Sequence, residues 1–224
     1  MAGSWDTDEA KVRDYVDRMG RLAPRQVGEA ELLEALPPAV GSLLDLGCGD
    51  GRLARLVLDA HPEVRRVVAV DTSAPMLDLA RIALGGDDRT TLVEHDLATP
   101  ITALGTFDAV VSGFAIHHVT DDRKRALFAE IAEALAPGGV FANLEVVPCA
   151  TPELHAEFYR RIGRAGDDPE DVLAPVDAQL AWMREAGLAH VDCQWRWRGY
   201  ALLTGSRPPE PHPLASGPCP HGSR

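Results

Sequence analysis

Short apolar runs alternate with helical patterns through the middle of the chain. Leu43-Leu44 and Val67-Val68-Ala69-Val70 are apolar at successive positions, which is typical of strands covered on both faces. The pattern predicts strands at 42–46, 67–71, 91–95, 107–112 and 140–147, and helices at 52–60, 75–84 and 122–135. This alternation predicts βαβ units around a parallel sheet with helices on both faces.

The pattern changes on either side of this central region. Two helices are expected before it, at 9–19 and 25–36, and two after it, at 152–162 and 176–186. The strands expected at 190–197 and 200–204 are joined by the tight turn Arg198-Gly199, which predicts an antiparallel pair. We therefore expect a helical cap segment over 1–40, one domain over 41–205 and a disordered, proline-rich tail over 206–224.

Composition and charge narrow the class of protein. Apolar residues make up 46% of the chain, but no apolar run approaches the roughly 18 residues that a membrane helix needs. Asp6, Asp8 and Glu9 stand where a signal peptide would be basic, so we expect a cytoplasmic protein without a membrane partner. We expect the protein to be a monomer or a homodimer. The net charge of -12 disfavours nucleic acid as a partner, although a local basic patch at 160–164 leaves that alternative open.

Cysteine and histidine spacing indicates no metal site. The four cysteines lie far apart, without a Cys-x-x-Cys pair, so reduced thiols and no structural metal are expected. His212, Cys219 and His221 in the tail fit no metal-binding spacing either.

Three glycines follow the first buried strand and precede a helix. Gly47, Gly49 and Gly51 would let the backbone turn sharply and approach a ligand, with helix N–H groups aimed at it. A dinucleotide-binding turn would need a further glycine where Arg52 stands, which disfavours NAD. A turn that needs glycine only for its own geometry is the alternative.

Carboxylates end three successive predicted strands. Asp71 lies 20 residues beyond Gly51, where this architecture places an acceptor for ribose hydroxyls, and Ser73 is the better cap for the next helix. Asp96 ends the third strand, where it could accept the exocyclic amine of an adenine. Together with Asp45, these carboxylates are expected to converge on the crevice where open α/β sheets bind ligands.

Five segments between about Leu43 and Val147 resemble the class I S-adenosylmethionine-dependent methyltransferases, broadly the small methyltransferase-domain families. The segments are Leu44-Asp45-Leu46-Gly47-Cys48-Gly49-Asp50-Gly51, Val68-Ala69-Val70-Asp71-Thr72-Ser73 with Met76-Leu77, His95-Asp96-Leu97, Phe107-Asp108-Ala109-Val110-Val111-Ser112 with Ile116-His117-His118, and Leu135-Ala136-Pro137-Gly138-Gly139. The resemblance implies an α/β, Rossmann-like, doubly wound sheet of seven strands, mostly parallel with the last strand antiparallel. It also implies S-adenosylmethionine as the cofactor.

Carried over residue by residue, the resemblance assigns the parts of the cofactor. The implied contacts are the methionine portion at Asp45, Gly47, Cys48, Gly49 and Gly51, the ribose at Asp71, the adenine at Thr72, Met76, Asp96 and Leu97, and the ammonium group at a backbone carbonyl from Ser112 or Gly113.

Candidate catalytic residues follow the fourth and fifth predicted strands. His117 and His118 lie near where the methyl group should point, and histidine is suited to take a proton near neutral pH, so both are general-base candidates, with His118 preferred. Packing against the cofactor or capping the next helix is the alternative for both. Glu145 is a second candidate, with an ordinary polar residue at the pocket rim as its alternative.

The resemblance also implies substrate contacts, because similar enzymes often build the acceptor lid from the segment after the fifth strand. On the helix expected there, at 152–162, His155 and Tyr159 share a stripe. As in similar enzymes, Tyr15 in the N-terminal segment is expected to close over the cofactor. The function expected is methyl transfer to an O, N or C atom of a small-molecule acceptor. The alternatives are a tRNA- or macromolecule-modifying methyltransferase and a non-methylating S-adenosylmethionine-binding protein, because fold does not fix function.

Overall fold

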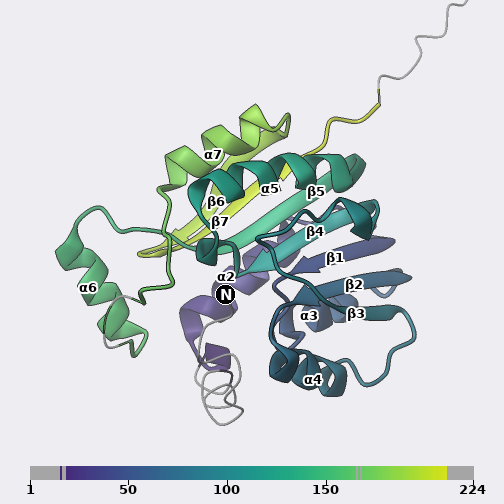
Figure 1. The fold of residues 1–224 in the computed structure, drawn as a ribbon, viewed down its shortest axis with the longest axis horizontal. Coiled ribbons are helices and arrows are strands. Elements are labelled where there is room, and N and C mark those ends of the chain that lie inside the picture. Colours follow the sequence, from purple (N-terminus) through teal and green to yellow (C-terminus); the bar gives the residue numbers. More distant parts are fainter. Residues whose placement is uncertain (1–15, 17–18, 165, 167, 211–224) are drawn as a thin grey trace, which may run out of the picture.

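The structure, a computed structural model, contains one seven-stranded sheet with helices on both faces (Figure 1). It describes residue 16, residues 19–164, residue 166 and residues 168–210. The strands are β1 (Ser42–Leu46), β2 (Arg66–Asp71), β3 (Thr90–Glu94), β4 (Phe107–Gly113), β5 (Leu135–Val146), β6 (Ala189–Trp197) and β7 (Tyr200–Ser206). The helices are α2 (Ala23–Glu34), α3 (Arg52–Ala60), α4 (Ala74–Ala83), α5 (Asp121–Ala134), α6 (Pro152–Arg161) and α7 (Val176–Glu185), with short 3-10 turns η1 (Thr102–Leu104) and η2 (Ile116–His118).

The strand order is β3-β2-β1-β4-β5-β7-β6. β1 to β5 pair in parallel, whereas β7 lies between β5 and β6 and runs antiparallel to both. The predicted fold class is confirmed, including the antiparallel direction of the last strand, β7. No described helix has both the length and the apolar character that crossing a membrane requires.

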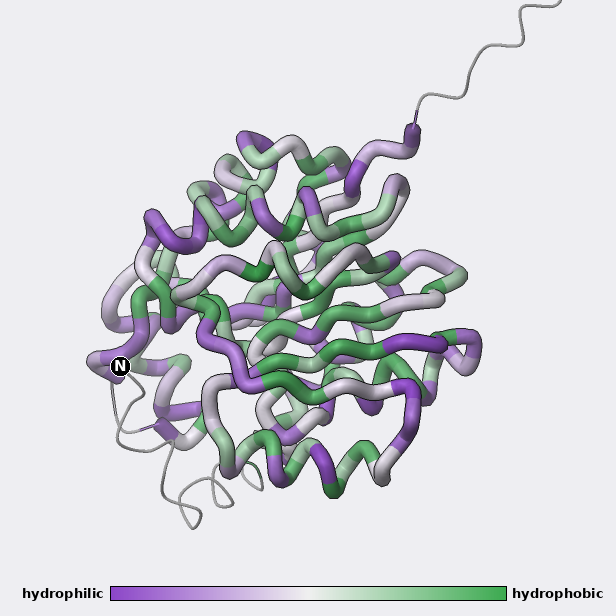
Figure 2. Tube along the Cα trace, turned by 45° about the vertical axis from the view of Figure 1, so that its right-hand side comes forward, coloured by the Kyte–Doolittle hydropathy of each residue, from purple (hydrophilic) through white to green (hydrophobic). Residues whose placement is uncertain are grey.

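Successive strand residues pack into two separate core layers. Leu43 and Val67 belong to the layer that includes residues of α2, α3 and α4, while their neighbours Leu44 and Val68 belong to the layer that includes residues of α5 and α7. Figure 2 shows the strands as a hydrophobic centre between more polar helices. This two-sided burial explains why the strand sequences are apolar at successive positions.

The start of β5 differs from the prediction. Leu135 already pairs with Phe107, and the register shifts before Ala109 pairs with Val140. Gly138, at φ +81°, allows this irregularity within the strand, so the predicted start at 140 is wrong. The other predicted elements within the described residues begin and end within about two residues of the observed bounds. The helix expected at 9–19 lies largely outside the described residues.

Candidate functional site

The turn between β1 and α3 is built from left-handed glycines. Gly47, Gly49 and Gly51 have φ angles of +68°, +53° and +78°, a region that side chains disfavour. A Cβ on Gly47 would also overlap the side chain of Ala115, in the segment that follows β4. The turn therefore needs glycine both for its conformation and for its close approach to this segment.

Gly47→Ala is expected to lower the free energy of unfolding by roughly 3 kcal/mol, because the left-handed conformation costs a side chain about 1 to 2 kcal/mol and overpacking adds about 1 to 3. Gly86→Ala is the matched control, since Gly86 has φ +70° but no atom within 4 Å of its Cβ position. Urea unfolding of both variants measures the difference. Equal losses would show that the approach to Ala115 has no energetic consequence.

Asp71, the last residue of β2, holds this turn in place through a hydrogen bond to its backbone. Its Oδ2 accepts a hydrogen bond from the N–H of Gly49 at 2.8 Å, and its Oδ1 accepts one from the N–H of Ser73 at 2.9 Å. Burial raises the pKa of this carboxyl. Ser73 caps α4 by accepting from the N–H of Met76, as predicted. A carboxylate has more acceptor positions than two, so Asp71 can still bind hydroxyls in the cleft that it lines.

Asp45 is fully buried in β1. Its Oδ2 accepts from the N–H of Ala54 at 3.1 Å, while its Oδ1 has no hydrogen-bond partner among the described residues. Burial raises the pKa of Asp45 to about 7, and the charges of Asp71 and Asp50 act in the same direction. Asp45 therefore suits a cationic group that enters next to it.

Asp96 and Leu97 form the opposite end of the site, just beyond β3. The Oδ1 of Asp96 accepts from the N–H of Ala98 at 2.8 Å, and the side chain is exposed. The carbonyl oxygen of Leu97 accepts from Nε of Arg123 at 2.6 Å, and Arg123 also pairs with Glu130 in α5. Sequence reasoning missed Arg123, which holds this loop in place.

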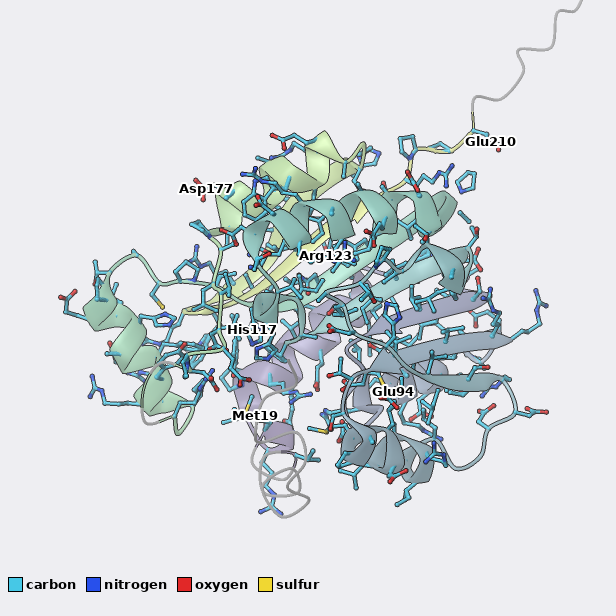
Figure 3. All side chains as sticks on the ribbon, in the orientation of Figure 1. Met19, Glu94, His117, Arg123, Asp177 and Glu210 are labelled. Carbon is cyan, nitrogen blue, oxygen red and sulfur yellow. The ribbon has the colours of Figure 1, made fainter. Side chains whose placement is uncertain are left out.

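A cleft of about 1150 Å³ connects these groups at the end of the sheet to which β1 and β4 point. In Figure 3, the labelled His117 lies near this end. The residues lining the cleft include Gly47, Cys48, Gly49, Asp71, Thr72, Met76, Asp96, Leu97, Gly113 and His118. Asp45 and Gly113 line a small adjoining hollow. Ser112 lines neither, and its hydroxyl donates to the carbonyl of Leu46 at 2.9 Å.

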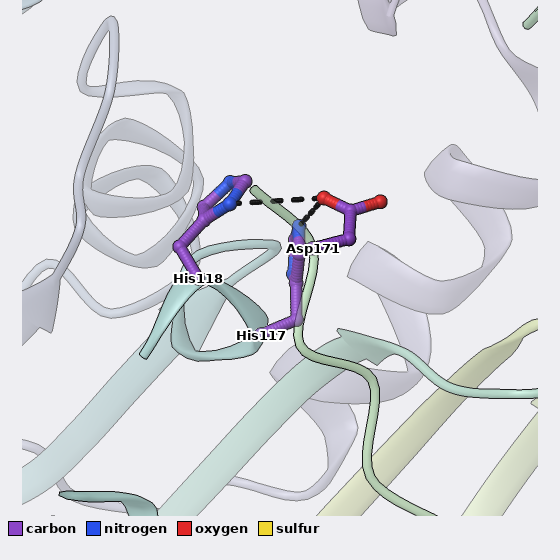
Figure 4. Close-up of side chains that lie close together, drawn as sticks. All are labelled: His117, His118 and Asp171. Atoms are coloured by element: carbon purple, nitrogen blue, oxygen red, sulfur yellow. Dashed lines mark ion pairs between the residues drawn. The ribbon is translucent and has the colours of Figure 1, made fainter. Parts of the chain in front are cut away.

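The two histidines differ in position. His118 lines the cleft and is 37% exposed, whereas His117 is buried and its Nδ1 lies 2.5 Å from Oε1 of Glu145. Glu145 is buried in β5, behind His117 and not at the pocket rim. Oδ1 of Asp171 lies 3.5 Å from Nε2 of His117 and 3.7 Å from Nδ1 of His118 (Figure 4). Burial lowers the pKa of His118, and the adjacent His117 adds to this.

Backbone and side-chain contacts bring Asp171 to the histidines. The N–H of Val172 donates to the carbonyl of His117 at 2.8 Å. The buried Nζ of Lys124 donates to the carbonyls of Val119 and Val172, at 2.7 and 2.6 Å. Asp171 was not predicted from the sequence, because no motif marks the loop that carries it.

Two of the predicted substrate-binding residues, His155 and Tyr159, do not line the cleft. Tyr159 is buried, and its hydroxyl donates to Oδ2 of Asp171 at 3.4 Å. Nδ1 of His155 accepts from the N–H of Cys149 at 3.3 Å. Neither side chain lines the cleft described above, so substrate contact by these residues stays a prediction. Tyr15 lies outside the described residues.

Comparison with known proteins identifies the family. A family model for a methyltransferase domain matches residues 43–139. A demethylmenaquinone methyltransferase from Roseiflexus castenholzii is 32% identical over 208 residues, which cover 85% of this chain and 83% of that protein. The chain belongs to the class I S-adenosylmethionine-dependent methyltransferases. The cofactor of this methyltransferase is accordingly S-adenosylmethionine.

Solved structures share the fold of this methyltransferase. An O-methyltransferase family protein from Burkholderia thailandensis aligns with a TM-score of 0.72 and 23% identity, covering 91% of this chain and 61% of that one. Human N-acetylserotonin methyltransferase, solved with S-adenosylmethionine, aligns with a TM-score of 0.65 and 15% identity over 90% of this chain and 57% of that one. The methyltransferase thus spans less than two thirds of either solved chain.

The residues present fit this cofactor. The cofactor's ammonium matches the unpartnered Oδ1 of Asp45, and its ribose hydroxyls match the acceptor positions of Asp71. Arg25 and Arg52, which both line the cleft, are candidates for its carboxylate, and both pair with the buried Glu29. Sequence analysis missed these arginines, although Arg25 and Glu29 stand four residues apart on a predicted helix.

Proposed function

We propose that this methyltransferase moves the methyl group of S-adenosylmethionine to an O, N or C atom of a small-molecule acceptor. The observation that supports this is one continuous cleft that contains both the glycine turn with Asp71 and the side chain of His118. Donor and acceptor can therefore meet in a single site. The net charge of -12 favours a small molecule over a nucleic acid.

The cofactor supplies an electrophilic methyl group when bound, so the protein mainly has to align the acceptor atom for in-line displacement. The acceptor atom forms a bond to the methyl carbon while the sulfur–carbon bond breaks, and S-adenosylhomocysteine leaves. The glycine turn, Asp45 and Asp71 hold the donor in our proposal. Thr72 and Met76 flank the adenine in the same proposal, and a backbone carbonyl of Ser112 or Gly113 faces the ammonium group.

We propose His118 as the group that takes the acceptor's proton, because it is the histidine of the pair that lines the cleft. His117 and Glu145 are buried behind it, and their hydrogen bond fixes the ring of His117. We therefore assign them a positioning role. His117 supports His118 through ring contact, with centroids 4.0 Å apart.

His118→Ala is expected to lower turnover by about 100-fold or more, because a positioned base contributes a factor of roughly 10² to 10⁴. Cofactor affinity should change little, since the imidazole pairs with Asp171 and not with the carboxylates that we assign to the donor. His61→Ala is the control, because His61 pairs with Glu63 outside the cleft. Release of S-adenosylhomocysteine and calorimetry measure the two effects. Full turnover in the variant would remove His118 from this role.

The proposed reaction itself is tested with a metabolite extract and isotopically labelled cofactor. We expect a small molecule to gain one methyl group in mass spectra as S-adenosylhomocysteine accumulates. Labelling of RNA or protein with no labelled small molecule would contradict the proposal.

A further inference from the structure

Three potential metal ligands meet at the acceptor end of the cleft. His117, His118 and Asp171 each offer one ligand atom, and these atoms all lie within 4.8 Å of one another (Figure 4). Oδ1 of Asp171 lies 3.5 Å from Nε2 of His117 and 3.7 Å from Nδ1 of His118. Metal–ligand bonds of about 2.0 to 2.2 Å at a tetrahedral centre place ligands roughly 3.4 Å apart, so this spacing suits one shared ion.

The hydrogen bond that His117 donates to Glu145 leaves the other ring nitrogen of His117 available to bind a cation. With the proton of His117 on Nδ1, directed at Glu145, the lone pair on Nε2 faces Oδ1 of Asp171. Two acceptors then face each other in a buried place, and Oδ1 of Asp171 has no hydrogen-bond donor among the described residues. A cation between them would satisfy both atoms. A carboxylate behind a ligating histidine is also the usual outer shell of a metal site.

Asp171 is held so that this one oxygen remains available. Its Oδ2 accepts hydrogen bonds from Arg164 at 3.1 Å and from Tyr159 at 3.4 Å. Lys124 fixes the following residue through the carbonyl of Val172. The carboxylate is only 4% exposed, so its position is determined by packing.

We propose that His117, His118 and Asp171 form a binding site for a divalent transition-metal ion such as Zn²⁺. Two imidazoles and one carboxylate are ligands that such ions accept, and three protein ligands leave at least one coordination position open. That position faces the cleft, because His118 and Glu170 line it. Our sequence-based expectation of no metal considered spacing along the chain and could not include Asp171.

The consequence for catalysis rests on the proposed function. An acceptor hydroxyl or thiol that binds the ion would lose its proton to solvent more readily, because a bound cation lowers the pKa of its ligands. The deprotonated atom would then take the methyl group as the sulfur–carbon bond breaks. In the loaded protein the lone pair of His118 would be on the ion, so the acceptor's proton would pass to solvent and not to His118.

Metal titration of the full chain, after treatment with a chelator, tests the site without any acceptor. We expect one Zn²⁺ per chain by calorimetry, and a visible Co²⁺ spectrum typical of tetrahedral coordination with nitrogen and oxygen ligands. Asp171→Asn and His118→Ala should each weaken binding by about 10-fold or more, and Glu145→Gln by roughly 10 to 100-fold. His118 is partly exposed, so its variant is expected to fold.

Two controls separate this site from others. Asp168→Asn changes a carboxylate on the same loop that pairs with Arg164 and should leave the affinity unchanged. A tail variant with His212→Ala and His221→Ala should also bind normally. The proposal is overturned if the wild-type chain binds no ion, if Asp171→Asn binds as tightly as wild type, or if the tail variant loses binding instead.

Activity measurements separate this inference from the proposed function. Loss of methyl transfer on chelation and recovery with Zn²⁺ would support coordination of the acceptor. Unchanged turnover without the ion would overturn the catalytic part and leave the proposed function intact. If the chain binds the ion as expected but methylates no small molecule, the proposed function is contradicted and the metal site still stands.

Discussion

Asp71→Ala is expected to weaken S-adenosylmethionine binding by about 100-fold or more. A hydrogen bond to a charged group contributes about 1.5 to 3 kcal/mol, and the ribose would lose two such bonds. Each 1.4 kcal/mol of binding free energy corresponds to a factor of about ten in affinity. The variant also leaves the N–H groups of Gly49 and Ser73 without their acceptor. The glycine turn would then be less ordered before the cofactor arrives.

Calorimetry with S-adenosylhomocysteine and with the intact cofactor measures this loss. Glu94→Ala is the matched control, because Glu94 is the residue that pairs with Asp71 across β2 and β3 and also lines the cleft. Its carboxylate accepts no hydrogen bond from the glycine turn, so affinity should change by less than about threefold. Thermal unfolding without cofactor checks that both variants fold. Equal affinities for wild type and Asp71→Ala would overturn the assignment of Asp71 to the ribose.

Asp45→Asn is expected to stabilise the cofactor-free protein above pH 7 while weakening cofactor binding. The folded-state pKa of about 7 lies above the reference value of 3.8, so between these values the folded chain holds a proton that the unfolded chain has lost. The free energy of unfolding of the wild type should therefore fall by roughly 4 kcal/mol as pH rises from about 4 to 7. Asparagine stays neutral and removes this dependence.

Binding should depend on pH in the opposite direction. The cofactor's ammonium favours the ionised carboxylate of Asp45, so wild-type affinity should rise by up to about tenfold per pH unit below pH 7 and then level off. Asp45→Asn should bind more weakly and without this rise. Denaturation and calorimetry from pH 4 to 8 check both effects, with the exposed Asp59→Asn as control. A wild-type stability that increases from pH 5 to 7 more steeply than that of Asp45→Asn would contradict the raised pKa.

The sheet and the positions of the carboxylates near the ends of its strands were predictable because local sequence determines them. Buried strands are apolar at successive positions, and residues at the ends of parallel strands meet at one edge. Asp45 and Asp71 could thus be placed from their positions alone. The early start of β5 was missed because pairing of Leu135 with Phe107 is a tertiary contact.

The part of the site around His117, His118 and Asp171 was less predictable because it depends on long-range contacts. His117 and His118 are equivalent in sequence, and only burial shows that one contacts Glu145 and the other the cleft. Asp171 reaches them through Val172, in a loop that has no motif. Arg123 was missed for a similar reason, because its partner is the backbone of Leu97.

The buried Lys124 would allow the part of this methyltransferase that contacts the methyl acceptor to change in sequence. Its ammonium group binds the backbone carbonyls of Val119 and Val172, and any residue type supplies such a carbonyl. The segment between β5 and α7 could therefore be exchanged for one of different sequence and still be fastened at the same point. The donor site that we propose at the ends of β1 to β4 would be inherited unchanged while the acceptor half diverged.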